Sequence, residues 1–480
     1  RNKRSTAAPI GGLTGVTAIA AGWQHAIALT QDGNVWAWGS NRAGQLGNGS
    51  MTTQSAPVQV QGLAAVSAIA VGGESTFALK QDGTVWAWGM NLSGQLGDAT
   101  TANRSLPVQV NGLTAVSAVA GGAFHAIARK QDGTVWAWGN NAHGELGDAS
   151  LTPRSTPARV NGLTSVMAIA AGRSYSLALK QDGTVWAWGR NVEGQLGDGS
   201  NTSRDAPAPV TGLSAVRAIA AGMSHSLALK QDGTVWAWGN NDHGQLGDGT
   251  LASRNTAVQV RGVDGVAAIA AGEAFTFALK QDGTLRGWGR NTHGELGDGS
   301  LSSRNTPVPV TRLTDVTGIA GGGTFGIALR QDGSVWAWGD NVSGQLGNGT
   351  YQGEREPVLV VNEEVDGPLD LSPEIPNTIP PERIPPFLLR TFKLGAPSMT
   401  TLYADLKGPT ATGSFAAAYD VYVAAGVPSG VVTLYFQLDS GNNWSALRWP
   451  MAEFLRGVVL ESQTSTVRAH ILNGADLSGL

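Results

Sequence analysis

The feature that most constrains this chain is an exact internal period of 50 residues. The stretch Gln181-Asp-Gly-Thr-Val-Trp-Ala-Trp-Gly189 recurs almost unchanged along the sequence. A fixed period of this length indicates one supersecondary unit copied in tandem, in which each copy buries its apolar face against its neighbours. The closing glycine of the stretch falls at Gly39, Gly89, Gly139, Gly189, Gly239, Gly289 and Gly339.

The repeated stretch predicts an antiparallel pair of strands. Thirteen of the 16 tryptophans lie in it, two residues apart, which in a strand places both indoles on one face. The Asp-Gly pair before it separates two β-prone runs and is a strong hairpin signal. Only Arg286 breaks the tryptophan pairing, so we expect the sixth repeat to be irregular.

Each repeat predicts four short strands. In the fourth copy they are residues 166–170 (strand A), 177–180 (B) and 184–188 (C), and strand D is residues 157–160 or its next copy at 206–210. Four short antiparallel strands repeated every 40 to 50 residues are typical of a propeller blade. Strand A ends in small residues, which fit where strands converge, so we place it nearest the axis.

The two ends of the repeat region each carry a copy of strand D. Residues 4–10 align with 154–160, and residues 356–360 form a further copy. A ring of blades must cover its last strand edge, because an unpaired strand edge promotes aggregation. We expect residues 7–10 to close the ring by sharing a blade with the seventh repeat, although which copy is surplus stays open.

The pattern from Ala221 to Thr250, Ala-Gly-x-x-His-Ser-Leu-Ala-Leu-Lys-x-Asp-Gly-Thr-Val-Trp-Ala-Trp-Gly-x-Asn-x-x-Gly-Gln-Leu-Gly-Asp-Gly-Thr, resembles the repeat of the regulator of chromosome condensation family. The resemblance recurs seven times and covers about residues 4–361. It implies a seven-bladed β-propeller. It does not imply one function, because the family includes nucleotide-exchange factors, ubiquitin-ligase accessory domains and secreted bacterial inhibitors of β-lactamases.

The sequence thus predicts an all-β chain in three parts. Residues 1–361 form the propeller. Residues 362–386 form a proline-rich linker, with seven prolines between 366 and 386. Residues 387–480 alternate short apolar runs with Gly, Pro and Asn, which is typical of a small β-sandwich.

Composition narrows the function classes. A formal charge of −4 gives no basic field for nucleic acid, and no apolar run is long enough to span a membrane. The absence of cysteine excludes disulfides, thiolate catalysis and cysteine-based metal sites. We expect no cofactor.

Few residues suggest catalysis or metal binding. The aspartates at Asp32 and its six equivalents belong to the hairpin turn. The histidines after strand A are expected to be structural, with a ring nitrogen bonding a backbone group, and the later histidines belong to different blades. We expect no catalytic or metal site. The first histidine row is His25, His125 and His225, and the second is His143, His243 and His293.

An aspartate six residues before an arginine recurs in five repeats. In the first repeat Asn48 replaces the aspartate and Gln54 replaces the arginine. In the seventh repeat Asn348 replaces the aspartate and Glu354 replaces the arginine. We expect the five pairs to bridge within the C–D loop. They are Asp98–Arg104, Asp148–Arg154, Asp198–Arg204, Asp248–Arg254 and Asp298–Arg304.

The candidate binding residues lie in the A–B and C–D loops, which emerge on one side of a propeller blade. These loops differ between repeats, whereas the Asp-Gly hairpins on the other side are nearly identical. Aromatic residues, Met and Arg most often anchor interfaces. The predicted partner-binding residues are Trp23, Arg42, Phe124, His143, Arg173, Tyr175, Arg190, Met223, His243, Phe275 and Arg290.

The sequence therefore favours a non-enzymatic binding or assembly protein, which we place outside a bacterial cell. Near-identical repeats, the absence of cysteine and the appended β-module resemble exported bacterial propellers. Its partner is expected to be a protein, a cell-surface glycan or further copies of itself. Two alternatives are nucleotide exchange on a small GTPase, for which the unbroken period leaves no room for the inserted wedge of that factor, and a glycan-active propeller enzyme.

Overall fold

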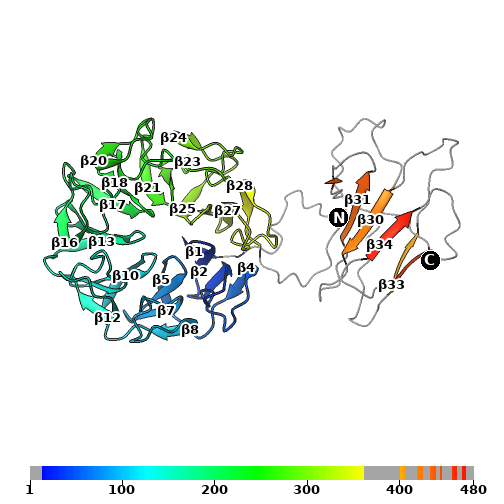
Figure 1. The fold of residues 1–480 in the computed structure, drawn as a ribbon, viewed down its shortest axis with the longest axis horizontal. Coiled ribbons are helices and arrows are strands. Elements are labelled where there is room, and N and C mark those ends of the chain that lie inside the picture. Colours follow the sequence, from blue (N-terminus) through cyan, green and yellow to red (C-terminus); the bar gives the residue numbers. More distant parts are fainter. Residues whose placement is uncertain are drawn as a thin grey trace, which may run out of the picture. The chain divides into compact units, whose positions relative to one another are not determined.

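The described part of the chain is a ring of four-stranded antiparallel sheets followed by a separate group of strands. The computed structural model describes residues 13 and 15–361 and six strands beyond them, and these residues contain strands but no helix. Seven consecutive sheets surround a common axis as blades (Figure 1). The predicted all-β, seven-bladed propeller is confirmed.

Within each blade the strands follow chain order from the axis outward. The A strands of neighbouring blades contact one another around the axis, as the small residues at their ends predict. The A strands are β1 (Val16–Ala21), β5 (Val66–Val71), β9 (Val116–Gly121), β13 (Val166–Ala171), β17 (Val216–Ala221), β21 (Val266–Ala271) and β25 (Val316–Gly321). The B strands are β2 (His25–Thr30), β6 (Ser75–Lys80), β10 (His125–Lys130), β14 (Tyr175–Lys180), β18 (His225–Lys230), β22 (Phe275–Lys280) and β26 (Phe325–Arg330).

The outer two strands of each blade carry the tryptophan motif and the strand that follows it. Strand D of a blade is the copy after strand C, not the one before strand A. The C strands are β3 (Val35–Gly39), β7 (Val85–Gly89), β11 (Val135–Gly139), β15 (Val185–Gly189), β19 (Val235–Gly239), β23 (Leu285–Gly289) and β27 (Val335–Gly339). The D strands are β4 (Gln54–Gln59), β8 (Arg104–Gln109), β12 (Arg154–Arg159), β16 (Arg204–Pro209), β20 (Arg254–Gln259), β24 (Arg304–Pro309) and β28 (Glu354–Leu359).

The Asp-Gly turn forms the B–C hairpin for local reasons. Asp182 Oδ1 accepts hydrogen bonds from Thr184 N (3.0 Å) and Thr184 Oγ1 (2.6 Å). Gly183 supplies the positive φ of 77° that this tight turn requires. These hydrogen bonds hold the pKa of Asp182 below its ordinary value. The prediction that the repeated aspartates serve the turn agrees with this geometry.

Neighbouring blades are joined by hydrogen bonds at three distances from the axis. Nearest the axis, the A–B loops bond backbone to backbone, as Trp23 N does to Gly73 O (2.9 Å). Farthest out, each C–D loop bonds the next blade's strand D, as Gly49 N does to Ser105 O (2.9 Å).

Between these two belts, the second indole of every blade donates to the preceding blade. Its Nε1–H bonds the carbonyl of a Gln or Glu in the C–D loop, as Trp188 does to Glu145 O (2.9 Å). All seven of these indoles are fully buried, namely Trp38, Trp88, Trp138, Trp188, Trp238, Trp288 and Trp338.

The same three belts close the ring between the seventh and first blades. The closing bonds are Gly323 N to Gly22 O (3.1 Å) and Gly349 N to Ser55 O (3.0 Å). The third is Trp38 Nε1 to Gln345 O (3.0 Å). In Figure 1 the blue strand β1 adjoins the yellow-green blade of β25 to β28.

No strand exchange between first and last blades is seen in the described ring. The outer position of the seventh blade is filled by its own β28, which pairs with β27. The structure thus places the later copy of strand D in the blade. The expectation of closure by residues 7–10 concerns residues outside the described ones.

The sixth blade is regular, so the expectation of an irregular blade at Arg286 is wrong. Strand β23 keeps the register of the other C strands, with Arg286 opposite Ala278 and Pro309. Arg286 is half-buried, as the corresponding tryptophans are, because the position leaves room for a long side chain to reach the surface.

The chain divides into two compact units, Arg1–Val365 and Asp366–Leu480. In the second unit, β30 (Tyr419–Ala424), β31 (Thr433–Leu438), β32 (Trp444–Ser445) and β34 (Val467–Ile471) form one sheet, and β29 (Thr401–Asp405) pairs with β33 (Gly457–Glu461). The linker at 362–386 lies outside the described residues, and the β-sandwich stays a prediction.

If ring closure uses the ordinary blade contact, Trp38→Phe and Trp338→Phe should be equally destabilising, because each indole bonds a carbonyl to which no hydroxyl of a described side chain also donates. Each removes a buried indole N–H and leaves a carbonyl with one partner fewer, which costs about 1–3 kcal/mol. Urea unfolding of the two variants measures this. Trp36→Phe, at a half-buried position, is the control and should cost less. A much milder effect at Trp38 than at Trp338 would mean that other contacts carry the closure.

Candidate functional site: the loop face and its axial mouth

One end of the propeller gathers the loops that differ between blades. Because strands A and C run in the same direction, the loops that follow them emerge together. We call this end the loop face, made of residues 22–24 and 40–53 and their equivalents in the other blades. The opposite end, the hairpin face, carries residues 31–34 and their equivalents.

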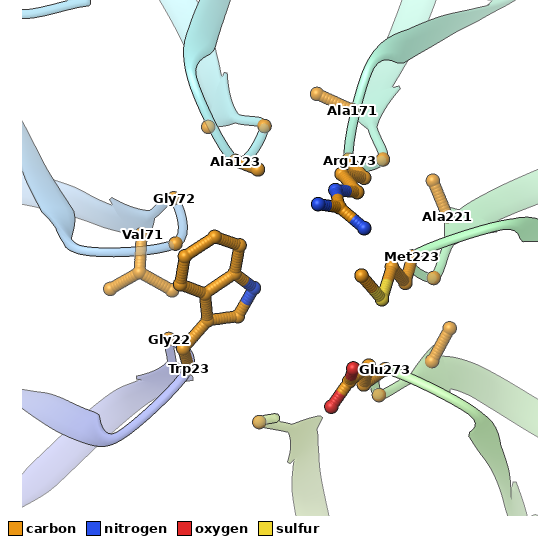
Figure 2. A pocket seen from close by; sticks show the side chains of 18 of the residues that line it. Gly22, Trp23, Val71, Gly72, Ala123, Ala171, Arg173, Ala221, Met223 and Glu273 are labelled. Carbon is orange, nitrogen blue, oxygen red and sulfur yellow. The ribbon is translucent and has the colours of Figure 1, made fainter. Parts of the chain in front are cut away.

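The loop face is hollowed at the axis. A cavity of about 190 Å³ is lined by the ends of the A strands and the residues just after them. Figure 2 shows the side chains of Trp23, Arg173, Met223 and Glu273 projecting into it. Glycine or alanine stands at the matching position of the other three blades, at Gly73, Ala123 and Gly323.

Nine of the eleven predicted binding residues lie on the loop face. Trp23 contacts Phe124 edge to face, with ring centroids 5.6 Å apart. The exposed members are Arg42, His143, Arg173 and His243, and the half-buried members are Trp23, Phe124, Arg190, Met223 and Arg290.

The other two, Tyr175 and Phe275, are fully buried, so their prediction as surface anchors is wrong. Each is the first residue of its B strand, and there the side chain points into the seam with the next blade. The Tyr175 hydroxyl donates to His225 O (2.5 Å), and burial raises the pKa of this phenol. Both residues belong to the core.

Arg290 lies on the face but is held within the protein. Its guanidinium bonds Glu273 (2.9 Å), the buried Glu295 (3.0 Å) and Gly323 O (2.8 Å). Only 16% of the side chain is exposed. Sequence reasoning missed this network, whose signal is glutamate at Glu145 and Glu295 where the other five repeats have glutamine.

Glu145 occupies the same buried position without an arginine. Its carboxylate accepts hydrogen bonds from His143 N (2.7 Å) and Asn140 Nδ2 (2.5 Å). Burial raises the pKa of Glu145 in spite of these bonds. Glu145 therefore orders its own loop.

The first histidine row is structural, as predicted, but its partner is a side chain. His25 Nε2 bonds Thr76 Oγ1 of the next blade (3.0 Å), and Thr76 Oγ1 donates to Gln45 O (2.8 Å). His125 and His225 make the same bond to Ser176 and Thr276. Burial lowers the pKa of each of the three histidines to about 4.

The residue pairs across these seams vary together within the chain. The residue 51 positions after each His or Tyr carries a hydroxyl, as Thr76 does after His25. The corresponding residue is Gly326 for Phe275 and Ala26 for Phe325. This correlation between the two positions of the repeat could have indicated from the sequence that they are in contact across the seam.

The second histidine row offers no shared site. His143, His243 and His293 are exposed on three different loops. Within residues 13 and 15–361 and the six later strands, no cluster of three metal-ligating side chains occurs.

The five predicted Asp–Arg bridges are confirmed. The nitrogen–oxygen distances are 2.7, 2.7, 2.5, 3.1 and 3.2 Å from the second to the sixth blade. The aspartates are nearly buried and the arginines about 40% exposed, so each pair orders a loop at a modest gain in stability.

The fold and its loop face define a repeat propeller of the regulator of chromosome condensation type. The sequence matches the RCC1-like domain over residues 2–261, and the RCC1 repeat over 282–329 and 332–367. The chain belongs to the RCC1-like domain family.

Curated relatives match only short segments. The chain is 47% identical over 45 residues to the ultraviolet-B receptor UVR8 of Arabidopsis thaliana, and 43% identical over 54 residues to the mitochondrial RCC1 domain-containing protein RUG3 of the same plant. These segments span about a tenth of each relative's length (10% and 12%) and of this chain (9% and 11%).

Solved propellers match most of the chain. Prp20p of Saccharomyces cerevisiae, a structure described with its binding properties to Gsp1p and histones, is 25% identical with a TM-score of 0.62, covering 74% of this chain and 88% of its own. Human WBSCR16 is 25% identical with a TM-score of 0.62, covering 68% and 93%. Yeast RCC1 (Prp20) bound to Kap60 is 24% identical with a TM-score of 0.63, covering 76% and 90%.

The buried histidines predict that the free energy of unfolding falls as pH drops from about 6.5 to about 4. In this window the unfolded histidines take up protons while the folded ones, with pKa values of about 4, do not. Each histidine should lower stability by roughly 1.4 kcal/mol per pH unit. Urea unfolding at several pH values measures the slope.

The chain itself supplies the matched control. His25→Phe with Thr76→Ala copies the natural pair of Phe325 and Ala26. This double variant should remove about a third of the pH dependence, because three similar sites contribute additively. An unchanged slope would show that other groups cause it.

Proposed function

We propose that this chain is a non-enzymatic binding protein whose loop face engages another protein. One observation carries the proposal: side chains differ from blade to blade on the loop face, while Gln-Asp-Gly is identical in all seven hairpins on the opposite face. The inter-blade belts use mainly backbone atoms and buried indoles, so variation on the loop face leaves the ring intact.

The chemistry of the loop face suits protein recognition. It presents the Trp23–Phe124 pair and the exposed cations Arg42 and Arg173 around a hollow centre. Aromatic and arginine side chains supply most hot-spot energy in protein interfaces. One structural neighbour, yeast Prp20, is described as bound to Kap60 and as binding Gsp1p and histones, and this supports a protein as the partner.

We place this binding outside a bacterial cell. The support is the near-identity of the repeats, the absence of cysteine and the strands that follow the propeller. Among the described residues, no helix is both long and apolar enough to cross a membrane. Digestion by protease added to intact cells of the source organism tests the location, and protection of the protein until lysis would contradict it.

Nucleotide exchange on a small GTPase is less well supported. From β1 to β28 every blade has the same length, and no inserted wedge interrupts the described ring. A second copy of the chain is an alternative occupant and an outcome of the test below, whereas a surface glycan would give no crosslinked polypeptide from the loop face.

A photo-crosslinking amino acid at Arg42 or His143 should capture a protein partner in the source cells. The same amino acid at Gln31 or Gln131 is the control, because these exposed residues lie on the hairpin face of the same two blades. Mass spectrometry identifies the product as another protein or as this chain. Equal crosslinking from both faces, or crosslinking from the hairpin face alone, would refute the proposal.

A further inference from the structure

The axial mouth of the loop face is asymmetric in both size and charge. Large side chains enter it from Trp23 and from three adjacent blades, through Arg173, Met223 and Glu273 (Figure 2). At the matching position the remaining blades have only Gly73, Ala123 and Gly323, although the second blade also lines the cavity with Val71. Since the cavity measures about 190 Å³, well below the volume of a pocket for a drug-sized ligand, it can take only one small group.

The indole of Trp23 is fixed as one wall of this cavity. A Cβ on Gly73 would lie 3.0 Å from Cε2 of Trp23, so the ring packs directly over the Gly73 backbone. Phe124 of the third blade, which follows the blade of Gly73, contacts the indole edge to face. The indole therefore offers a rigid apolar surface beside the Met223 thioether.

The two charged groups at the mouth differ in their partners. Glu273 is bound by Arg290 at 2.9 Å, and Arg290 is bound in turn by the buried Glu295. For Arg173, by contrast, residues 13 and 15–361 supply no ion pair and no side-chain hydrogen bond. Arg173 thus presents a guanidinium with free donors at the edge of an apolar wall.

From this geometry we propose that the axial mouth binds a carboxylate carried on a short apolar stem. Arg173 pairs with the carboxylate through two parallel N–H···O bonds, and Trp23 and Met223 cover the stem. Among the described residues that line the cavity, Arg173 is the one cationic side chain, so it matches the single negative charge of a carboxylate better than the two charges of a phosphate dianion.

A partner protein carries this group either as a glutamate side chain or as its C-terminal carboxylate. The inference rests on the proposed function, because it names the part of the partner that enters the centre of the loop face. Both sources share the same chemistry, and the two arms of the experiment separate them.

Calorimetric titration of the full chain with short peptides tests the site. One arm compares a glycine-rich peptide ending in a free Leu carboxylate with its C-terminal amide. The other compares a blocked peptide with an internal Leu-Glu with the same peptide carrying Leu-Gln. In at least one arm the carboxylate peptide should bind tenfold or more tightly than its neutral partner.

Substitutions then locate the binding. Arg173→Gln should abolish the tenfold preference, and Trp23→Ala should weaken both members of the pair. Arg159→Gln is the control, because Arg159 is an exposed arginine on the outer strand β12, and it should leave binding unchanged. Inorganic phosphate at the same concentration should not compete.

Three results would overturn the proposal: no preference for the carboxylate in either arm, a preference that survives Arg173→Gln, or equal competition by phosphate. Failure here is distinct from failure of the proposed function. If the peptides fail but crosslinking from Arg42 and His143 succeeds, the loop face binds a protein without placing a carboxylate in the axial mouth. If that crosslinking is also absent, both the proposed function and the proposed carboxylate site are refuted.

Discussion

One side-chain hydrogen bond, repeated seven times, joins every blade of this propeller to its neighbour: the buried indole N–H of each blade donates to a loop carbonyl of the blade before it. Because a buried donor without a partner is costly, the C–D loop must stay folded against the next blade wherever the indole is buried. This bond therefore fixes the long loops as well as the blades. With the blades and loops held in this way, the backbone donors and acceptors of the inner and outer belts lie opposite one another.

Much of the fold could be predicted because its causes are local and repeated. The Asp-Gly hairpins, the order of the strands and the Asp–Arg bridges each depend on residues close together in sequence, and seven copies made their pattern clear. The predictions that were wrong concern residues whose burial or strand register depends on residues far away in the sequence. Tyr175 and Phe275 stand in variable loops by sequence, but the seam with the next blade buries them. The irregular sixth blade expected at Arg286 did not appear, because pairing with β22 and β24 sets the register of β23.

The candidate site was predictable as a face but not as a cavity. Sequence comparison of the repeats identified the loop face because variation concentrates there. It could not show that Arg290 is held by two glutamates, while Arg173, at a different loop position, points into the axial mouth. Side-chain direction around the axis depends on which neighbours are glycine, and that is a property of the whole ring.

Each blade is one uninterrupted stretch of chain, from β1 to β4 and finally from β25 to β28, and the closing contact is the same as every other contact. One 50-residue repeat therefore carries a complete blade together with its two loops. Exchange of one whole repeat for another would replace a blade and its loops without cutting through a sheet, and the number of blades would stay at seven. A ring of this kind can change its recognition surface by exchange of intact units.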